Sequence, residues 1–498
     1  MAKILIDSVG FETRAAIIAK GRMEHFEIER KENLSLAGNI YKGRVVRVLP
    51  ALNAAFLNIG ESREVFLPLT DLYEFAPYQE EMAEEVTKKG THSSRLKVKP
   101  KEDVLVQVVK NAIGTKAPKV TANHISLAGH LLVLLPQDEI RRTISRRITS
   151  STERERLLTT VSNFLPPEFG FIIRTSAERC SERVLRAEAE RLRKTWEGIR
   201  LGFQNNAAPT CLYVELRLHL RILRDYFTPE ISEVLVDSPV VLRDCRRHLA
   251  QFGIDGRKVQ LHQEKVPLFT KLGVDDTIEK ALNRTVPLKG GGYLIIEETE
   301  ALCAIDVNSG RTGGEDYRSM ILRTNLLAAE EIAWQLRLRN LGGLIVVDFI
   351  DMDRGDDRRK VYQAFEKALE PDKARIKVLK VSRLGLVEMT RQRTRESLRD
   401  YLVDDCPACR GQGKILSVET TAGQLRRSLQ IEFSSRRRFL GRYYPRKKTD
   451  VKVSPQFAQY LKENFNRFFP ERFYQNGINI VPDPNLGPNQ FKIEGENQ

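Results

Sequence analysis

The chain opens with short segments in which apolar and polar residues alternate. The runs ILIDSV, TRAAIIAKG and EHFEIER within residues 1–33 follow this pattern and predict β-strands. So few short strands bury too little apolar surface to be stable alone. We therefore expect residues 1–33 to join a later segment of the chain.

Residues 34–125 are also rich in strand patterns, with Gly, Pro and Asn at the turns. The runs are NIYKGRVVRVLPALNAAFLNIG, REVFLPLTDL and DVLVQVVKNAIGTKAPKVT. About five short strands in this length predict a small closed barrel. The polar insert from about Tyr73 to Lys101 predicts a mobile loop.

Later segments mix strands with helices. HLLVLLP, FGFIIRTS and EVLVDS predict strands, whereas TERERLLTTVSNFL, SERVLRAEAERLRKTWEGI and LRLHLRILRDYF predict helices. We find no repeat of fixed period. The expected domains are residues 1–33 with 216–285, 34–125, 126–215, 286–400, a link at 401–415 and a small domain at 416–498.

Two apolar strands within residues 286–400 end on aspartates. LCAIDVN contains Asp306, LIVVDFI contains Asp348, and helical spacing runs between them from Asp316 to Asn340. A strand–helix–strand unit makes its strands parallel. Asp306 and Asp348 should then lie at one carboxyl-terminal sheet edge, where ligands bind in open α/β sheets.

Two carboxylates at such an edge repel each other unless a cation or a proton lies between them. Mg²⁺ accepts one or two carboxylates, keeps waters and completes its shell with phosphate oxygens. Asn308 lies two residues beyond Asp306, on the same strand face, and can orient a ligand. This predicts a Mg²⁺ site for attack of water on a phosphodiester. The alternative is that both aspartates are polar strand ends or helix caps.

The composition indicates a soluble, multidomain protein. Of its 498 residues, 41% are hydrophobic and 30% charged, and no apolar run reaches the roughly 18 residues of a membrane span. The N-terminus lacks the apolar core of a secretory signal. A formal charge of +15 favours a polyanionic partner, nucleic acid before an anionic membrane. The alternative is that basic charge only aids solubility.

Basic residues gather in several clusters, which together predict an extended track for a polyanion. They are Arg141, Arg142, Arg146 and Arg147, then Arg391, Arg393 and Arg395, and finally Arg436 to Lys448 interleaved with Phe439, Tyr443 and Tyr444.

Aromatic and basic residues also share the predicted barrel. Phe56 and Phe66 accompany Tyr41, Lys42, Arg44 and Arg47, and Lys110 and Lys116 extend the basic edge. Aromatic rings stack on bases while cations hold the nucleic-acid backbone. The alternative is that Phe56 and Phe66 belong to the barrel core.

Six cysteines in a chain of this length favour a reducing, cytosolic compartment. Cys406-Pro-Ala-Cys409-Arg-Gly-Gln-Gly413 has the spacing of half a zinc site. A second copy of the chain would supply the other half and give a zinc-linked dimer. A redox pair is the alternative, although no thioredoxin-like unit surrounds it.

Taken together, the residues resemble the bacterial ribonuclease E/G family almost from end to end. The strings that carry the resemblance are NIYKGRV, AAFLNIG, FLPL, ISLAG, ISRRI, FIIRT, LRDY, GGYLIIEETEAL, AIDVNSG, TNLLAAEEIAWQLRLRNLGGLIVVDFIDM, GLVEMTRQR and CPACRGQG. The chain ends soon after the small C-terminal domain, as in the short members of that family.

The resemblance implies a multidomain α+β fold. Its parts would be a split RNase H-like domain carrying an inserted S1-type OB-fold barrel and a 5′-sensor domain, a DNase I-like α/β catalytic domain, the zinc link and a small C-terminal α+β domain. It implies a cytoplasmic endoribonuclease for single-stranded, AU-rich RNA, favouring 5′-monophosphorylated ends. Products would carry 5′-phosphate and 3′-hydroxyl groups. Substrates would be rRNA precursors, tRNA precursors and mRNA. A non-catalytic RNA-binding scaffold is the alternative.

The resemblance also assigns roles to single residues. Asp306 and Asp348 would bind Mg²⁺ beside Asn308, and Cys406 and Cys409 would share Zn²⁺ with the partner protomer of a homodimer or homotetramer. The RNA would lie on Phe56, Phe66, Lys116, Lys110, Arg146 and Arg147. The 5′-monophosphate would occupy a pocket of Gly129, Val133, Arg174 and Thr175. Ala117-Pro118 after Lys116 departs from the family pattern.

Overall fold

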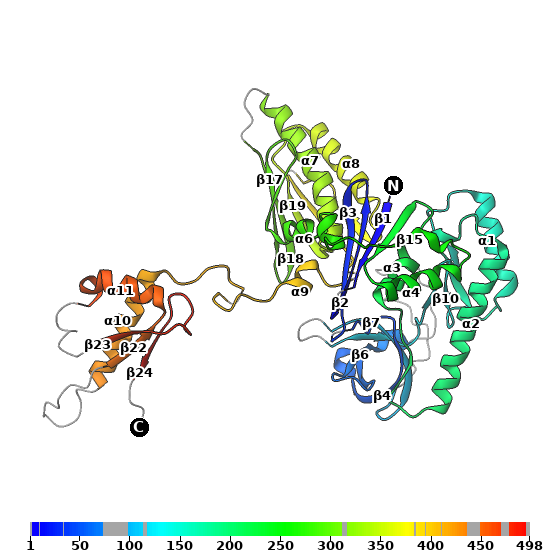
Figure 1. Ribbon diagram of the computed structural model, residues 1–498, viewed down its shortest axis with the longest axis horizontal. Helices are drawn as coiled ribbons and strands as arrows, with labels where there is room; N and C mark the ends of the chain where they lie inside the picture. The colour runs from blue at the N-terminus through cyan, green and yellow to red at the C-terminus, as the bar shows by residue number, and fades with distance from the viewer. Residues whose placement is uncertain are drawn as a thin grey trace. The chain divides into compact units, whose positions relative to one another are not determined.

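The computed structural model describes residues 2–8, 10–32, 34–72, 98–112, 117–310, 316–382, 385–393, 395–409, 411–435, 449–469 and 478–494 (Figure 1). Lys116, most of the predicted loop between Tyr73 and Lys101, and the basic cluster from Arg436 to Lys448 lie outside these residues. The chain forms two compact units, Met1–Tyr401 and Leu402–Gln498.

The first strands of unit 1 join a much later segment, as their shortness predicted. The five-stranded sheet has the order β15-β14-β1-β2-β3, with β1 parallel to β14 and antiparallel to β2. Ile4 and Ile6 of β1 pack on Val234 and Val236 of β14 in one core. The elements are β1 (Ala2–Asp7), β2 (Glu12–Ala19), β3 (Arg22–Arg30), α3 (Leu218–Tyr226), β14 (Ile231–Val236), α4 (Pro239–Ala250), η5 (Gly256–Lys258), β15 (Val259–Leu261), α5 (Leu268–Lys271) and α6 (Val274–Leu282).

The next strands close a five-stranded barrel of OB type, which confirms that prediction. Its order is β4-β5-β6-β8-β7, and β7 pairs back onto β4. Val45, Leu57, Leu67 and Val106 fill its interior. The elements are β4 (Ile40–Leu49), η1 (Pro50–Leu52), β5 (Ala54–Asn58), β6 (Val65–Pro68), η2 (Leu69–Leu72), β7 (Asp103–Lys110), β8 (Lys119–Thr121) and β13 (Thr210–Tyr213), which pairs with β4.

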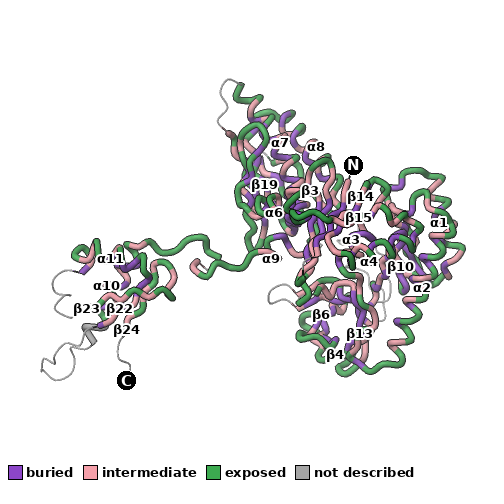
Figure 2. The backbone as a smooth tube through the Cα atoms, in the orientation of Figure 1, coloured by how far each residue is buried: buried purple, intermediate pink, exposed green. Residues whose placement is uncertain are grey.

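A four-stranded sheet, in the order β11-β12-β10-β9, packs on two helices. Phe171 of β12 is fully buried against Leu185 of α2, whereas the outer positions of α1 and α2 are exposed (Figure 2). The elements are β9 (Leu127–Ala128), β10 (Leu132–Leu135), β11 (Arg142–Ile144), α1 (Ser151–Phe164), β12 (Gly170–Ile173), η4 (Thr175–Ala177) and α2 (Glu182–Asn205).

The last sheet of unit 1 has the order β16-β17-β18-β19-β21-β20. Alternate residues such as Ile305 and Val347 are buried beneath α7 and α8, as expected when helices cover one face. The predicted strand–helix–strand unit is confirmed. The elements are β16 (Thr285–Pro287), β17 (Tyr293–Glu298), β18 (Leu302–Asn308), α7 (Tyr317–Leu338), β19 (Gly343–Asp348), α8 (Gly355–Leu369), β20 (Ile376–Val378), β21 (Leu386–Arg391) and α9 (Leu398–Leu402), which ends at the border with unit 2.

Unit 2 is a small α/β body with its own core. Val451 and Val453 of the central strand pack against Leu425, Leu429 and Phe457. The elements are α10 (Val418–Ser435), β22 (Thr449–Val453), α11 (Pro455–Phe468), β23 (Ile478–Pro482) and β24 (Phe491–Glu494), with the sheet order β23-β22-β24. Across the described ranges of both units, no helix combines the length and apolarity needed to cross a bilayer.

Candidate functional site

Asp306 and Asp348 lie side by side on neighbouring strands. They are Cα partners in the parallel pairing of β18 with β19, so both side chains leave the same face of the sheet. Both are exposed. Asn308 shares that face, and its Nδ2 donates a 2.8 Å hydrogen bond to Oδ2 of Asp306. The expectation that the two aspartates meet at one sheet edge is confirmed.

Buried contacts beneath the sheet fix this edge. Ile305 and Val307 flank Asp306 in sequence and are buried, which turns the carboxylate to the opposite face. Asn325 of α7 is fully buried; it donates to the carbonyl of Ile350 at 2.8 Å and accepts from the N–H of Ile350 at 3.1 Å. These two hydrogen bonds to the backbone of Ile350, just after Asp348, hold the end of β19 against the helix.

The electrostatics of the edge suit a cation. Partial burial raises the pKa of Asp348, and the negative charges of Asp306 and Asp351 raise it further. In the part of the chain that the structure describes, no group of three or more Asp, Glu, His and Cys side chains could enclose a metal. Two carboxylates in register nevertheless match Mg²⁺, which keeps several waters.

Tyr293 is a further residue on this face that sequence reasoning did not single out. It is the Cα partner of Asn308 across the antiparallel β17–β18 pair, and it is 38% exposed. A tyrosine beginning a strand is an ordinary strand residue in the sequence. The feature of the sequence that could have identified it is the alternation of apolar and polar residues in β17, which places Tyr293 on the face opposite Leu294 and Ile296.

On the barrel, Phe56 and Phe66 form a half-buried pair outside the core. They are Cα partners on β5 and β6, half-buried, with ring centroids 5.8 Å apart at 71°. Arg47 lies over the Phe56 ring at 4.5 Å and pairs with Glu64 at 3.0 Å. The alternative that both rings are core residues is wrong, because the barrel core uses the residues that alternate with them.

The other basic residues of the barrel have different surroundings. Lys110 is exposed at the end of β7, whereas Lys116 lies outside the described residues. Tyr41 is buried in the barrel core, so its grouping with the stacking aromatics is wrong. Lys42 donates to the carbonyls of Phe203 and Asn206 at 2.8 and 2.9 Å. It therefore attaches the barrel to the end of α2.

Arg174 lies at the centre of the residues expected to bind a 5′-phosphate. Its Nη1 donates to the carbonyl of Gly129 at 2.7 Å, and its Nη2 donates to Oδ1 of Asp225 at 2.8 Å. Lys373, from the loop after α8, donates to the carbonyl of Asp225 at 3.1 Å. Burial lowers the pKa of Lys373 to about 8, and the nearby charge of Arg174 adds to this shift. Asp225 and Lys373 were not predicted.

The neighbours of Arg174 include further polar and basic side chains. Thr175 begins η4, and its hydroxyl hydrogen-bonds that of Ser145 at 2.9 Å. Val133 is half-buried on β10. Arg146 and Arg147 are exposed after β11, and Arg147 donates to the carbonyl of Pro371 at 3.4 Å. The positive charge of Arg147 also contributes to the lowered pKa of Lys373, so Arg147 lies close to the group formed by Arg174, Asp225 and Lys373.

Comparison with known proteins identifies the family of the chain. A family model described as the Ribonuclease E/G family matches residues 126–394. The chain is also 36% identical to Ribonuclease G of Escherichia coli (strain K12) over 498 residues, which is 99% of both chains.

The chain belongs to the ribonuclease E/G family. Membership makes it an endoribonuclease. Ribonuclease G of Haemophilus influenzae is 38% identical over 99% of both chains. Ribonuclease E of E. coli (strain K12) is 36% identical over 87% of this chain but only 40% of its own length.

In this ribonuclease E/G chain, two arginines of the basic cluster that begins at the end of β21 are held in ion pairs. Arg391 is 5% exposed and pairs with Asp372 at 2.8 Å. Arg395 pairs with Glu27 of β3 at 2.8 Å. The expectation that Arg391, Arg393 and Arg395 form a track for a polyanion is therefore wrong for Arg391 and Arg395, which hold segments together.

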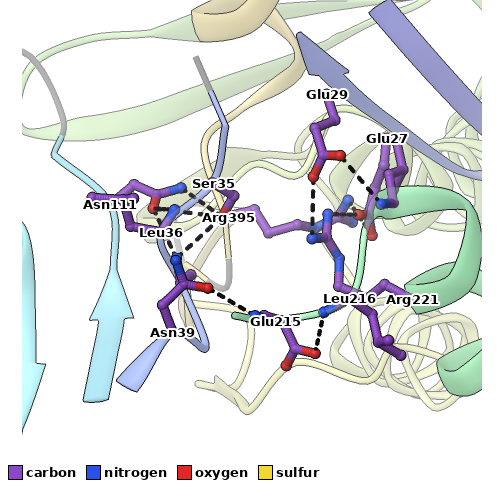
Figure 3. Close-up of polar contacts among 12 residues, drawn as sticks. Glu27, Glu29, Ser35, Leu36, Asn39, Asn111, Glu215, Leu216, Arg221 and Arg395 are labelled. Atoms are coloured by element: carbon purple, nitrogen blue, oxygen red, sulfur yellow. Dashed lines mark hydrogen bonds and ion pairs between the residues drawn. The ribbon is translucent and has the colours of Figure 1, made fainter. Parts of the chain in front are cut away.

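Figure 3 shows the network that Arg395 joins. Arg221 of α3 contacts Glu27 at 3.1 Å and Glu29 at 3.5 Å. Burial alone would raise the pKa of Glu27, but Arg395 and His25 lower it strongly overall. Nearby, Oδ1 of Asn39 accepts from the N–H of Glu215 at 2.8 Å (Figure 3). A cavity of about 1160 Å³ is lined by Glu27, Glu29, Glu215, Arg221 and Arg395.

The cysteine pair forms a tight turn in unit 2. Cys406 is exposed and Cys409 half-buried. The N–H of Gly413 donates to Sγ of Cys409 at 3.3 Å. The pKa of Cys406 is lowered by backbone N–H groups at Cys409 and Ala408, which favour its thiolate. Two sulfurs on one turn with N–H groups directed at them fit half of a tetrahedral zinc site.

Proposed function

We propose that this chain is a Mg²⁺-dependent endoribonuclease for single-stranded RNA. The observation that carries the proposal is the in-register pair Asp306 and Asp348 on the open face of the sheet. When bound, Mg²⁺ supplies positive charge to the scissile phosphate and lowers the pKa of water. Hydrolysis would leave 5′-phosphate and 3′-hydroxyl ends.

The chain's own residues prepare this step. Asp306 and Asp348 would bind the cation, whose positive charge would offset the repulsion between their carboxylates. The Asn308 amide fixes the Asp306 carboxylate through its 2.8 Å hydrogen bond. Its remaining N–H can donate to a phosphate oxygen. Asn325 keeps the end of β19, and hence Asp348, in place from below.

Phe56 and Phe66 would hold the RNA near the cut. Their half-exposed rings offer faces on which unpaired bases stack, and a base in a duplex presents no such face. Lys110, Arg146 and Arg147 are exposed cations for the backbone. Lys116 belongs to the same set in the family pattern. We infer a preference for flexible, AU-rich stretches, as found in rRNA and tRNA precursors and in mRNA.

The recess around Arg174 would recognise a 5′-monophosphate. A guanidinium pairs with phosphate through two parallel hydrogen bonds, and Thr175 adds a hydroxyl donor. Gly129 and Val133 form its wall. A bound end would stimulate cleavage by lengthening the time that the RNA stays on the enzyme.

Zinc would join two copies of the chain. Cys406 and Cys409 supply two thiolates, and a partner protomer would supply the same two, completing four ligands. A homodimer follows from one such link, and a homotetramer follows if a second surface pairs. We place the protein in the cytoplasm, where free cysteines persist.

The aspartate pair is tested by separating cleavage from binding. Asp306→Asn and Asp348→Asn should each slow cleavage of a single-stranded RNA at least a hundredfold, about 2.7 kcal/mol of barrier. RNA affinity should change little. Wild-type cleavage rates in either variant would eliminate the proposed centre. If the wild type binds RNA but never cuts it with Mg²⁺ present, the chain is a binding scaffold.

A further inference from the structure

A buried carboxylate lies close to Arg174. Glu188 is on the inner face of α2 and is 1% exposed. Its Oε1 accepts from the N–H of His130, and its Oε2 accepts from the N–H of Leu131 at 2.8 Å. Nη2 of Arg191 lies 3.6 Å from Oε1 of Glu188. Both carboxylate oxygens are thus used to hold two successive backbone N–H groups.

These two residues belong to a short loop that also holds Arg174. The loop Gly129–Leu131 joins β9 to β10. The carbonyl of Gly129 accepts from Nη1 of Arg174 at 2.7 Å, and the carbonyl of Leu131 accepts from the backbone N–H of Arg174 at 2.8 Å. The loop therefore contacts Glu188 through its N–H groups and Arg174 through its carbonyls.

Glycine at position 129 is required by this packing. A Cβ there would collide with the Glu188 carboxylate and would lie 2.7 Å from the carbonyl oxygen of Leu132. The N–H of Gly129 donates to that same carbonyl at 2.8 Å, which closes the turn. The carboxylate and the loop are consequently packed with no intervening side chain.

Holding a carboxylate here has an energetic cost. Burial raises the pKa of Glu188 to about 7, although the Leu131 N–H and Arg191 act to lower it. An apolar side chain at position 188 would avoid that cost, as the buried leucines at positions 185 and 192 of the same helix do. The compensation that the structure shows is the pair of hydrogen bonds to the loop.

We propose that Glu188 is a positioning residue that sets the 5′-phosphate preference by fixing the Gly129–Leu131 loop and, through it, the guanidinium of Arg174. The proposal rests on the proposed 5′-monophosphate recess. Glu188 touches no substrate. Its effect reaches the phosphate through two carbonyls that orient the side chain and the backbone of Arg174.

The experiment compares 5′-monophosphate and 5′-hydroxyl forms of one RNA with Glu188→Gln. The amide places an NH₂ group against one of the two loop N–H donors, so one hydrogen bond is lost. We expect the ratio of kcat/KM for the two RNAs to fall about tenfold, which corresponds to about 1.4 kcal/mol. The fall should arise from a higher KM for the monophosphate form. Amide exchange at His130 and Leu131 should become faster.

Three controls give each outcome a meaning. Glu190→Gln, on the exposed side of α2, should leave the ratio unchanged. If Glu188→Gln does not fold, Glu188→Asp, which keeps both oxygens but withdraws them, should reduce the ratio by less. Thr175→Val should lower the ratio by itself.

Failures of the two proposals are distinguishable. If Thr175→Val lowers the ratio and Glu188→Gln does not, the positioning role is wrong and the recess stands. A lower ratio with unchanged amide exchange also overturns positioning through the loop. If the wild type cleaves both RNAs equally, the 5′-monophosphate recess is wrong, and the proposed role of Glu188 falls with it.

Discussion

Asp306 and Asp348 occupy the same register position on two parallel strands, so two carboxylates leave adjacent backbones in one direction. Such a pair is electrostatically unfavourable without a counter-ion: burial raises the pKa of Asp348, and the negative charge of Asp306 raises it further. The fold tolerates this because α7 and Asn325 secure the strand ends from the other face. The two carboxylates therefore repel each other while the backbone that carries them is held in place, an arrangement that suits a metal centre.

Removing one charge should stabilise the protein without metal. In EDTA, Asp348→Asn relieves the repulsion from Asp306, and we expect unfolding to cost up to about 1 kcal/mol more than in the wild type. Adding Mg²⁺ should stabilise the wild type but not the variant, because only the wild type binds the ion. Thermal denaturation with and without Mg²⁺ measures both effects. Equal stabilisation of both proteins by Mg²⁺ would count against binding at this pair.

Loss of one ring from the barrel pair should weaken RNA binding. Stacking contributes about 1–3 kcal/mol per base, so Phe56→Ala should weaken binding of a single-stranded RNA by roughly 5- to 150-fold. Phe11→Ala is the matched control, because Phe11 is 61% exposed in a turn outside the barrel. Fluorescence anisotropy gives both affinities. Similar losses in the two variants would show that the barrel pair is not special.

Acid should destabilise the fold through a buried histidine. Burial lowers the pKa of His248 to about 4, and His130, Arg191, Arg224 and His219 face it. Because the folded-state pKa is below the ordinary 6.5, the unfolded state takes up a proton first as the pH falls. His248 therefore leaves the free energy of unfolding undiminished above pH 6.5 and lowers it as the pH falls toward 4. At roughly 1.4 kcal/mol per unit, the loss is at most about 3 kcal/mol.

Urea unfolding of His248→Leu at several pH values tests this dependence. As the pH is lowered, the free energy of unfolding of this variant should fall less steeply than that of the wild type. Part of the slope should remain, because burial also lowers the pKa of His25 to about 4. His124→Gln is the control, since His124 is exposed. A slope identical to the wild type in His248→Leu would refute the assignment.

Arg391 should be required for stability rather than for RNA. Its guanidinium pairs with Asp372 at 2.8 and 3.2 Å, and both side chains are almost fully buried. Arg391→Met leaves the buried Asp372 carboxylate without its cation, with only the backbone N–H of Ala374 still donating to it, at a cost of about 3–5 kcal/mol. Arg284→Met breaks the exposed pair with Glu297 and should cost at most about 1 kcal/mol. Chemical denaturation measures the free energy of unfolding of both variants. If Arg391→Met lost as little stability as Arg284→Met, the structural role of Arg391 would be contradicted.

The sequence predicted that Asp306 and Asp348 meet at one sheet edge because one local pattern decides it. Two apolar strands separated by a helical segment must be parallel, and residues at their carboxyl ends must then meet. The barrel followed from alternation in the same way. Both inferences use order along the chain, which the sequence contains directly.

Polar pairing over long separations was not predictable. Arg391 stands among other arginines and has the pattern of a surface cluster, yet its partner Asp372 comes from a separate loop. Asp225 reaches Arg174 from helix α3, and Glu188 is one acid among many on a charged amphipathic helix. Nothing in local periodicity distinguishes a buried, paired charge from a solvated one.

The most direct test of the central claim is single-turnover cleavage of a 5′-monophosphorylated, single-stranded RNA across a Mg²⁺ titration, with the ends of the products determined. Wild type should cut only with the metal and leave 5′-phosphate and 3′-hydroxyl ends. Asp348→Asn should stay at least a hundredfold slower at saturating Mg²⁺. Cleavage by the wild type in EDTA, or cleavage by Asp348→Asn at the wild-type rate, would contradict the account.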